Sequence, residues 1–282
     1  MKTEVPDFTY DLLAVLVVYD YSLVESPAWH SLEEEAKRLQ VTFHVMIYDN
    51  SLVAQNLPVT SLTIHYRHDK TNPGVSKAYN EAYKLASQLK KNWLLLLDQD
   101  SLFPSGWMEH YNSAIKIDNL SIAVPLMISA TQKIISPFNY WVCIGRSPKQ
   151  ILTNSISLEQ WFAINSGLLI SCKIFEKVGG YDEAIPLDFS DYALMHKLKK
   201  LKVKMHVLLL SAKHSLSSME NRGIKYAQVR FYTYCKGNKG FARYTGLAIF
   251  HFFVCGCRAI KFSIHYRSFT FMNIFIRTWA TG

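Results

Sequence analysis

The sequence lacks the features that mark membrane-spanning, zinc-binding or disulfide-stabilised proteins. None of its apolar runs reaches about 18 residues, the length that crosses a bilayer. Its cysteines number five and have no zinc-site spacing, so we expect reduced thiols in a cytoplasmic protein. Residues 1–10 contain Glu4 and Asp7 and lack the basic-then-apolar order of a signal peptide. We therefore expect no export.

Negative charge is also scarce, with 22 acidic residues against 31 basic ones and a formal net charge of +9. This balance indicates an anionic partner, which could be nucleic acid, an acidic lipid surface or a phosphorylated substrate. Internal repeats, Gly/Ser linkers and the phosphate-binding patterns GxGxxG and GxxxxGK[ST] are absent. With 282 residues, of which 49% are hydrophobic, the chain is long and apolar enough for one large α/β domain with or without an appendage.

Several of the acidic residues follow predicted strands. Residues 93–97 include four consecutive leucines, which is typical of a buried strand in a parallel sheet, and Asp98 and Asp100 follow directly. Ligands of open α/β sheets bind outside the carboxyl ends of the strands. An Asp-x-Asp pair there suits Mg²⁺ or Mn²⁺ together with diphosphate oxygens, although two acids after a strand also serve simply to cap a loop.

The preceding sequence alternates between predicted strands and helices. Residues 12–19, 43–48 and 63–66 read as strands, and helices are expected after Ser26 and after Gly74. Asp49 follows the second strand, where its carboxylate either hydrogen-bonds a nucleotide base or ribose or holds its own turn. The sequence leaves both possibilities open.

The order and spacing of four motifs resemble the inverting family-2 glycosyltransferases with a GT-A fold. These motifs are Tyr19-Asp20 after the first strand and residues 47–51, 72–80 and 97–101. The Asp-Gln-Asp-Ser form is most similar to bacterial rhamnosyltransferases of surface-polysaccharide (O-antigen or capsule) assembly. The resemblance implies an α/β fold with a mostly parallel central sheet flanked by helices. It also implies a nucleotide-sugar donor, dTDP-rhamnose by the nearest match and a UDP-hexose as the alternative.

The same resemblance implies roles for individual residues. Asp49 would lie near the base, Asp98 near the ribose, and Asp100 on a divalent cation, Mg²⁺ or Mn²⁺, that bridges the diphosphate. His214 matches the family's histidine after the last strand, expected at residues 203–210, and would be a second metal ligand. A lone histidine is as often structural. The other donor-binding residues implied are Tyr19, Asn72, Gly74, Lys77 and Gln99.

An inverting transfer needs a general base that removes a proton from the acceptor hydroxyl. Family members place this acid just before a helix and six residues ahead of a basic residue, and Asp191 with Lys197 fits. The sequence departs from the pattern by having Asp188 and Ser190 where many relatives have Glu next to the base, so Asp188 stays a competing candidate. Another interpretation of Asp191 is a helix N-cap.

The chain beyond the predicted sheet is aromatic and basic. We expect residues 131–153 to be an irregular insertion beside the cleft. Residues 10–215 would form the catalytic domain and residues 216–282 a helical region. Its interleaved phenylalanines and cations suit the anionic inner face of a cell membrane, although packing on the domain and oligomer formation also explain them.

The sequence thus predicts a peripheral cytoplasmic enzyme that transfers a sugar to a lipid-linked glycan. Nucleic acid is not the expected partner, because acidic strand ends would repel phosphates in the absence of a metal. A non-catalytic membrane-associated protein with this fold is the remaining alternative, since a fold alone does not establish an activity.

Overall fold

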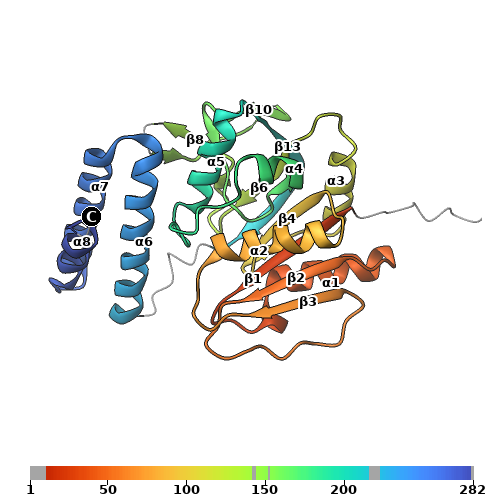
Figure 1. Ribbon diagram of the computed structural model, residues 1–282, viewed down its shortest axis with the longest axis horizontal. Coiled ribbons are helices and arrows are strands. Elements are labelled where there is room, and N and C mark those ends of the chain that lie inside the picture. The colour runs from red at the N-terminus through yellow and green to blue at the C-terminus, as the bar shows by residue number, and fades with distance from the viewer. Residues whose placement is uncertain (1–10, 142–143, 152, 216–222, 281–282) are drawn as a thin grey trace, which may run out of the picture.

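The computed structural model describes residues 11–141, 144–151, 153–215 and 223–280. A ten-stranded mixed sheet forms its centre, and three long helices follow at one side (Figure 1). Four strands in the order β3-β2-β1-β4 are parallel to one another and make up the first half of the sheet. Their bounds are β1 (Leu12–Val18), β2 (His44–Asp49), β3 (Thr63–His68) and β4 (Trp93–Asp98).

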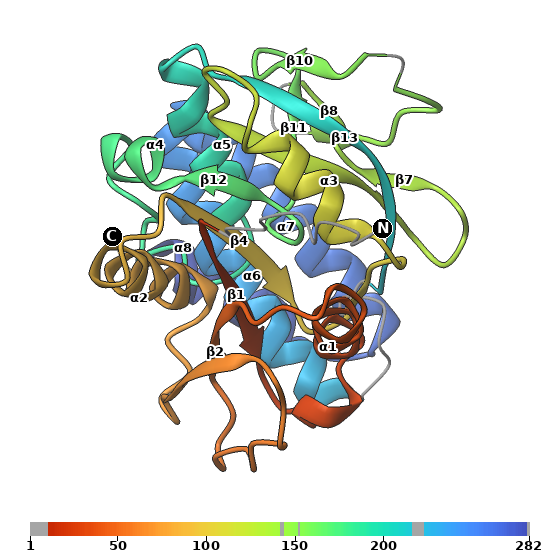
Figure 2. The ribbon, with the colours of Figure 1, turned by 90° about the vertical axis from the view of Figure 1, so that its right-hand side faces the viewer.

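Helices cover both faces of this parallel half, which explains why β1 is apolar at every position. Alternate residues of β1 belong to two separate cores, one with Leu13 and one with Leu12. Figure 2 shows α1 and α3 on one side of the sheet and α2, α4 and α5 on the other. These helices are α1 (Pro27–Leu39), α2 (Val75–Gln88), α3 (Trp107–Ala114), α4 (Cys172–Lys177) and α5 (Ser190–Lys200), and a short 3₁₀ turn η1 (Leu23–Glu25) precedes α1.

Local sequence explains where the first helices begin. The Ser26 hydroxyl accepts a hydrogen bond from the Trp29 N–H, and Pro27 occupies the first helical position, where its missing N–H costs nothing. On α2, Ala78, Ala82 and Ala86 are fully buried at intervals of four residues. Their small side chains let α2 lie close against the sheet.

The second half of the sheet continues from β4 in the order β12-β6-β13-β10. Strand β12 runs antiparallel to both neighbours, which makes the sheet mixed, whereas β6 and β13 are parallel. The short strands β5 and β7 add to β13 and β6 at the edges. The bounds are β5 (Ser101–Leu102), β6 (Ile122–Ile128), β7 (Ile134–Ser136), β10 (Ser155–Ser157), β12 (Leu169–Ser171) and β13 (Lys204–His214).

Strand β13 is longer than the predicted strand at residues 203–210. Its register against β6 shifts between Val207 and Ser211, after which pairing resumes. The far end of β13 then pairs with β5, which places His214 opposite Ser101. An irregularity within the strand therefore carries the histidine to the carboxyl end of β4.

The prediction of an irregular segment at residues 131–153 was wrong. Besides β7, this segment contributes β8 (Phe138–Trp141) and β9 (Ile144–Arg146) to a small sheet completed by β11 (Trp161–Phe162). The Tyr140 ring stacks on Phe162 with centroids 4.0 Å apart. The aromatic residues stabilise a second sheet by packing across its strands.

Three helices, α6 (Ile224–Thr245), α7 (Ala248–His265) and α8 (Thr270–Ala280), form the C-terminal region. Helix α6 packs on α5 through Phe241, which shares a buried cluster with Ile185 and Ala193. Gly237 allows this approach, because a Cβ there would lie 2.1 Å from the Asp188 carbonyl oxygen. A separate cluster joins α6, α7 and α8: Phe231, Cys235, Cys255, Ala259, Phe271 and Phe275.

Packing on the sheet-containing part of the chain therefore accounts for one face of α6, and the predicted boundary at residue 215 stays a prediction. Among the described helices, none combines the length and apolar character needed to cross a membrane.

Candidate active site

Two carboxylates and an imidazole meet at the carboxyl end of β4. One ligand atom each of Asp98, Asp100 and His214 lies within 4.8 Å of the other two. Asp98 ends β4 and Asp100 follows two residues later. His214 ends β13, which comes close to them by pairing with β5, directly after Asp100. Oxygen and imidazole ligands of this kind suit Mn²⁺. They also suit Mg²⁺, which usually takes only one or two carboxylates and fills its other positions with water or phosphate oxygens. The structure thus brings together the two residues predicted to hold a metal and adds Asp98 to them.

Buried hydroxyls hold this cluster in place. The Ser101 hydroxyl lies 2.8 Å from His214 Nδ1 and 2.6 Å from the Ser166 hydroxyl, and Ser166 accepts the backbone N–H of Asp98 at 3.1 Å. His214 Nδ1 also lies 3.4 Å from the Asp100 carboxylate. Hydrogen bonds of this kind fix the orientation of a side chain that binds a metal. Ser166 was not predicted as a site residue, and the pairing of β12 with β4 brings it near the cluster.

Asp98 is partly buried, and the removal of its carboxyl from water raises its pKa, while His214 and a hydrogen bond from Tyr79 act in the opposite direction. The Tyr79 hydroxyl donates to Asp98 at 3.0 Å. Tyr79 lies on the buried face of α2, next to Ala78, and its hydroxyl reaches the end of β4. Tyr79 was not predicted as a site residue. In the sequence, only the regular spacing of alanines on α2 indicated that this face of the helix is buried.

Asp191 lies in the first turn of α5, and its carboxyl has a strongly perturbed pKa. Burial raises this pKa to about 7, the N–H of Tyr192 opposes the shift through a hydrogen bond of 2.8 Å, and the nearby charges of Asp188 and Asp98 add to it. No cation pairs with Asp191 in the part of the chain that the structure describes. The N-cap interpretation was wrong, because the capping position is Phe189.

Asp188 has a different environment. Its Oδ1 lies 3.1 Å from Arg230 Nη2 on α6, and its backbone carbonyl contacts Gly237. Burial raises the pKa of the Asp188 carboxyl in spite of Arg230. Asp188 therefore joins the segment before α5 to α6, while Asp191 has no such partner.

A buried polar chain lies beneath Asp191. The Tyr181 hydroxyl donates to Asn165 Oδ1 at 2.7 Å, and Asn165 Nδ2 donates to the Ser190 hydroxyl at 3.1 Å. Burial raises the pKa of Tyr181 well above its usual value, and the charges of Asp191 and Asp98 raise it further. The Tyr181 ring packs on Tyr79, the residue that donates to Asp98, with centroids 5.0 Å apart. Asp98 and Asp191 therefore lie at the two ends of one set of buried polar and aromatic contacts.

Two predicted donor-binding residues are engaged in local hydrogen bonds. Asp49 is fully buried, and its carboxylate accepts from the Ser51 and Gln55 N–H groups and the Tyr66 hydroxyl. Burial alone would raise the pKa of Asp49, but these hydrogen bonds lower it overall. This is the turn-holding geometry that the sequence left open.

The other engaged residue is Gln99. Its amide accepts the Tyr19 N–H at 2.7 Å and donates to the Tyr19 carbonyl at 3.2 Å, which joins the ends of β1 and β4. The Tyr19 side chain itself is 46% exposed. Its ring, rather than the Gln99 amide, is thus open to a ligand.

The remaining predicted donor-binding residues precede or begin α2. Asn72 has φ +49° and Gly74 φ +91°, both in the left-handed region. A Cβ on Gly74 would lie 2.2 Å from the Pro186 carbonyl oxygen, so only glycine fits there. Lys77 Nζ lies 3.7 Å from Asp69. Gly74 thus holds the start of α2 against the segment that leads to Asp188 and Asp191.

No protein-family model matches this sequence, and no curated protein matches it. Among solved structures the chain resembles GalNAc-T7 in complex with UDP, GalNAc and Mn²⁺, with a TM-score of 0.53 and 13% identity. The match covers 94% of this chain and 56% of GalNAc-T7, so the chain spans about half the length of that protein. TarS of S. aureus matches with a TM-score of 0.49 and 12% identity over 81% of this chain and 39% of that one. The GT-A fold predicted from the sequence is confirmed.

Proposed function

We propose that the chain is a metal-dependent glycosyltransferase that uses a nucleotide-sugar donor. The proposal rests on one juxtaposition: the Asp98, Asp100 and His214 cluster lies near Asp191, a carboxyl that no cation of the described chain pairs with. The GT-A fold supports it, since the similar GalNAc-T7 structure contains UDP and Mn²⁺.

Asp100 and His214 would hold the divalent cation, with Asp98 beside it near the ribose. When bound, Mg²⁺ or Mn²⁺ neutralises charge on the diphosphate that leaves. Ser101 and Ser166 keep His214 and the end of β4 in place, so that the ligand atoms are arranged before the donor arrives. The other residues proposed to contact the donor are Tyr19, Asn72, Gly74 and Lys77, whereas Asp49 and Gln99 would support this part of the site by holding the strand ends.

Asp191 is the proposed general base. It accepts the proton of the acceptor hydroxyl while the oxygen attacks the anomeric carbon and the bond from that carbon to the diphosphate breaks, which inverts the configuration. A pKa of about 7 is well matched to this task, because the carboxylate is available and still basic near neutral pH. Asp188, which is paired with Arg230, is the weaker candidate.

We propose L-rhamnose from dTDP-rhamnose as the donor sugar and a lipid-linked glycan of a bacterial surface polysaccharide as the acceptor. The Asp-Gln-Asp-Ser motif at residues 98–101 supports rhamnose. A UDP-hexose is the second candidate, favoured by the UDP in GalNAc-T7. Because a few pocket contacts decide between related sugars, binding measurements rather than the fold will separate these donors.

Helix α7 supports a peripheral position on the inner face of the cell membrane. It exposes an apolar stripe, Ile249, Phe253, Ile260 and Ile264, whose side chains are 51–75% exposed and spaced by four, seven and four residues. Lys261 is exposed beside the stripe. An apolar helix face flanked by cations is suited to an anionic lipid surface.

Calorimetric titration with dTDP and UDP, each with and without Mn²⁺, tests the proposed function. We expect one nucleotide to bind only when Mn²⁺ is present, and Asp100→Ala to abolish that binding. Asp191→Asn is the matched control, because it removes a nearby carboxylate that does not hold the metal. A folded wild-type protein that binds neither nucleotide would contradict the proposal.

A further inference from the structure

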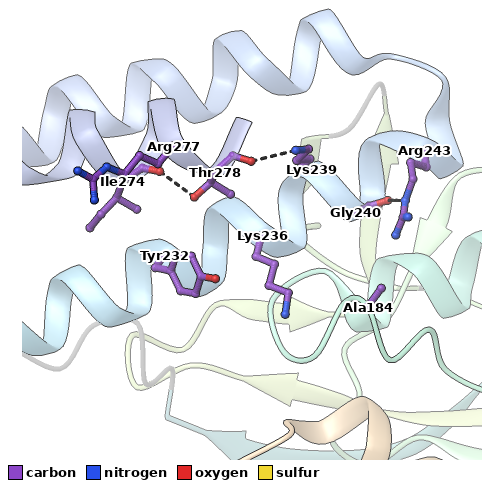
Figure 3. A pocket seen from close by; sticks show the side chains of 9 residues that line it. All are labelled: Ala184, Tyr232, Lys236, Lys239, Gly240, Arg243, Ile274, Arg277 and Thr278. Carbon is purple, nitrogen blue, oxygen red and sulfur yellow. Dashed lines mark hydrogen bonds between the residues drawn. The ribbon is translucent and has the colours of Figure 1, made fainter. Parts of the chain in front are cut away.

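A pocket of about 730 Å³ lies between α6, α8 and the loop at Ala184 (Figure 3). This volume falls within the range of small-molecule sites. The pocket is separate from the Asp98, Asp100 and His214 cluster, none of which lines it. Its lining residues are Ala184, Tyr232, Lys236, Lys239, Gly240, Arg243, Ile274, Arg277 and Thr278.

Four of the nine lining residues are cations, and none is acidic. Lys236, Lys239 and Arg243 are three, four and seven residues apart on α6 and therefore share one face of the helix, opposite Arg277 on α8. Among these, Lys236 makes no hydrogen bond or ion pair with any described residue. Figure 3 shows its side chain extending from α6 on the side of the Ala184 loop.

Internal contacts offset part of this positive charge. Arg243 Nη2 lies 3.7 Å from Asp182, and because the Arg243 side chain is 65% exposed, water screens this attraction. Lys239 donates to the Thr278 carbonyl at 2.9 Å and thereby joins α6 to α8 while keeping its charge. The pocket thus remains strongly cationic, which suits a ligand with more than one negative charge.

The two ends of the pocket differ. Tyr232, Ile274 and Arg277 lie at one end, and Arg243 and Ala184 lie at the other (Figure 3). Two residues after Ile274 on α8, Ile276 is 54% exposed. The second end is part of the loop that leads through Ile185 to Asp188 and Asp191. A ligand with an apolar chain and an anionic head would fit with its head toward the proposed base.

We propose that this pocket binds the diphosphate of the lipid-linked acceptor, with its apolar chain leaving past Tyr232 and Ile274. The inference rests on the proposed function, because it assigns the acceptor of that reaction to a place. Four cations match a diphosphate better than the single charge of a phospholipid phosphodiester. Guanidinium groups also bind phosphate oxygens through two parallel hydrogen bonds, and Arg243 offers such a group at the end near the Ala184 loop.

Calorimetric titration of the full chain with farnesyl diphosphate, farnesyl monophosphate and inorganic pyrophosphate tests this inference. EDTA is included, so that no diphosphate binds through a metal at Asp100. We expect farnesyl diphosphate to bind more tightly than either of the others. Lys236→Ala should weaken its binding about tenfold, the effect of losing one charged hydrogen bond, and Lys236→Arg should restore most of it.

Lys225→Ala is the matched control, since Lys225 is an exposed cation of α6 outside the pocket. Equal losses in Lys225→Ala and Lys236→Ala would overturn the inference, because they would indicate general charge attraction. Equal affinities for pyrophosphate and farnesyl diphosphate would show that the apolar chain is not recognised, which would overturn the assignment of a lipid-linked ligand. The absence of binding in a folded sample would also overturn it.

Titration of the same samples with dTDP, UDP and Mn²⁺ separates this inference from the proposed function. If farnesyl diphosphate binds through Lys236 but neither nucleotide binds, the pocket stands and the glycosyltransferase proposal fails. If a nucleotide binds and farnesyl diphosphate does not, the proposed function stands and the pocket assignment fails.

Discussion

The site at the strand ends and the C-terminal helices differ in how completely their polar groups are paired. In the first, Asp98, Ser101 and His214 are all hydrogen-bonded within the domain. In α6 and α7, by contrast, the buried atoms Asn238 Oδ1 and His251 Nδ1 have no hydrogen-bond partner. Each such atom costs about 1–3 kcal/mol. At the strand ends, Asn50 Oδ1 also has no partner, but the side chains of the cluster itself are held by hydrogen bonds. Among the described residues, the helices leave more of their buried polar atoms unpaired than the sheet does.

The junction between the two regions shows the same difference. Asp188 and Arg230 pair through one oxygen and one nitrogen, but the buried Asp188 Oδ2 and Arg230 Nε have no partner. Asp191, three residues later, has no cationic partner in the described chain. The surroundings of the two carboxylates thus differ: Asp188 links the two regions, and Asp191 is available for the role of general base that we propose for it.

Of the proposed changes, Asp191→Asn should have the largest effect, and it tests whether Asp191 and Asp188 differ in role. Because an amide cannot accept the acceptor proton, we expect kcat to fall by about 10²–10⁴-fold, the range of a lost general base. The Mn²⁺-dependent affinity for the nucleotide should stay within a factor of about two, since the metal ligands are untouched. Steady-state kinetics and calorimetry measure the two quantities. A parallel loss of nucleotide affinity would show that Asp191 supports the metal site.

The pH dependence of the wild-type enzyme should show the next largest effect. Burial raises the pKa of Asp191 to about 7, so the carboxyl becomes protonated and inactive as the pH falls through that value. We expect kcat/KM, which reports the free enzyme, to decrease about tenfold per pH unit below the pKa and to level off above it. A profile that is flat between pH 5 and about 8 would rule out a base with this pKa.

These two tests concern residues that the sequence identified by local patterns. Asp98, Asp100 and Asp191 each stand next to a strand or helix whose boundaries follow from periodicity, and the motif order gave the GT-A fold. His214 was found by resemblance, although the strand that carries it was predicted to end at residue 210. The register shift in β13 depends on the pairing of this strand with β6 and β5. The periodicity of the sequence carries no information about which strands pair.

Contacts between distant segments account for what the sequence could not supply. Ser166 reaches the cluster through the pairing of β12 with β4, and Tyr79 reaches it from α2. The Asp188 and Arg230 pair joins residues 42 positions apart. Since each depends on how whole elements pack, local propensity gives no signal for them. The strand at residues 138–141 was not predicted for a related reason. One of its partner strands lies at residues 161–162, outside the segment at 131–153.

Asp188→Asn tests the linking role at the junction. The amide keeps an oxygen for Arg230 but loses the ion pair, which at partial exposure contributes about 1 kcal/mol. We expect a decrease of a few degrees in the melting temperature and a loss of kcat of about tenfold or less, far smaller than for Asp191→Asn. Circular dichroism and kinetics measure these changes. A loss of kcat that equals or exceeds that of Asp191→Asn would make Asp188 the base.

The smallest expected effect belongs to the exposed apolar stripe of α7. Phe253→Ser should weaken association with phosphatidylglycerol vesicles several-fold, because 64% of the phenylalanine side chain is exposed and its transfer to lipid would be lost. Nucleotide binding should not change, since Phe253 lies on a helix that packs on α6 and α8 rather than on the sheet. Vesicle sedimentation measures the association, and Val229→Ser, at another exposed apolar position on α6, is the control. Equal sedimentation of all three proteins would mean that α7 does not contact lipid, and its exposed stripe would then indicate a protein interface instead.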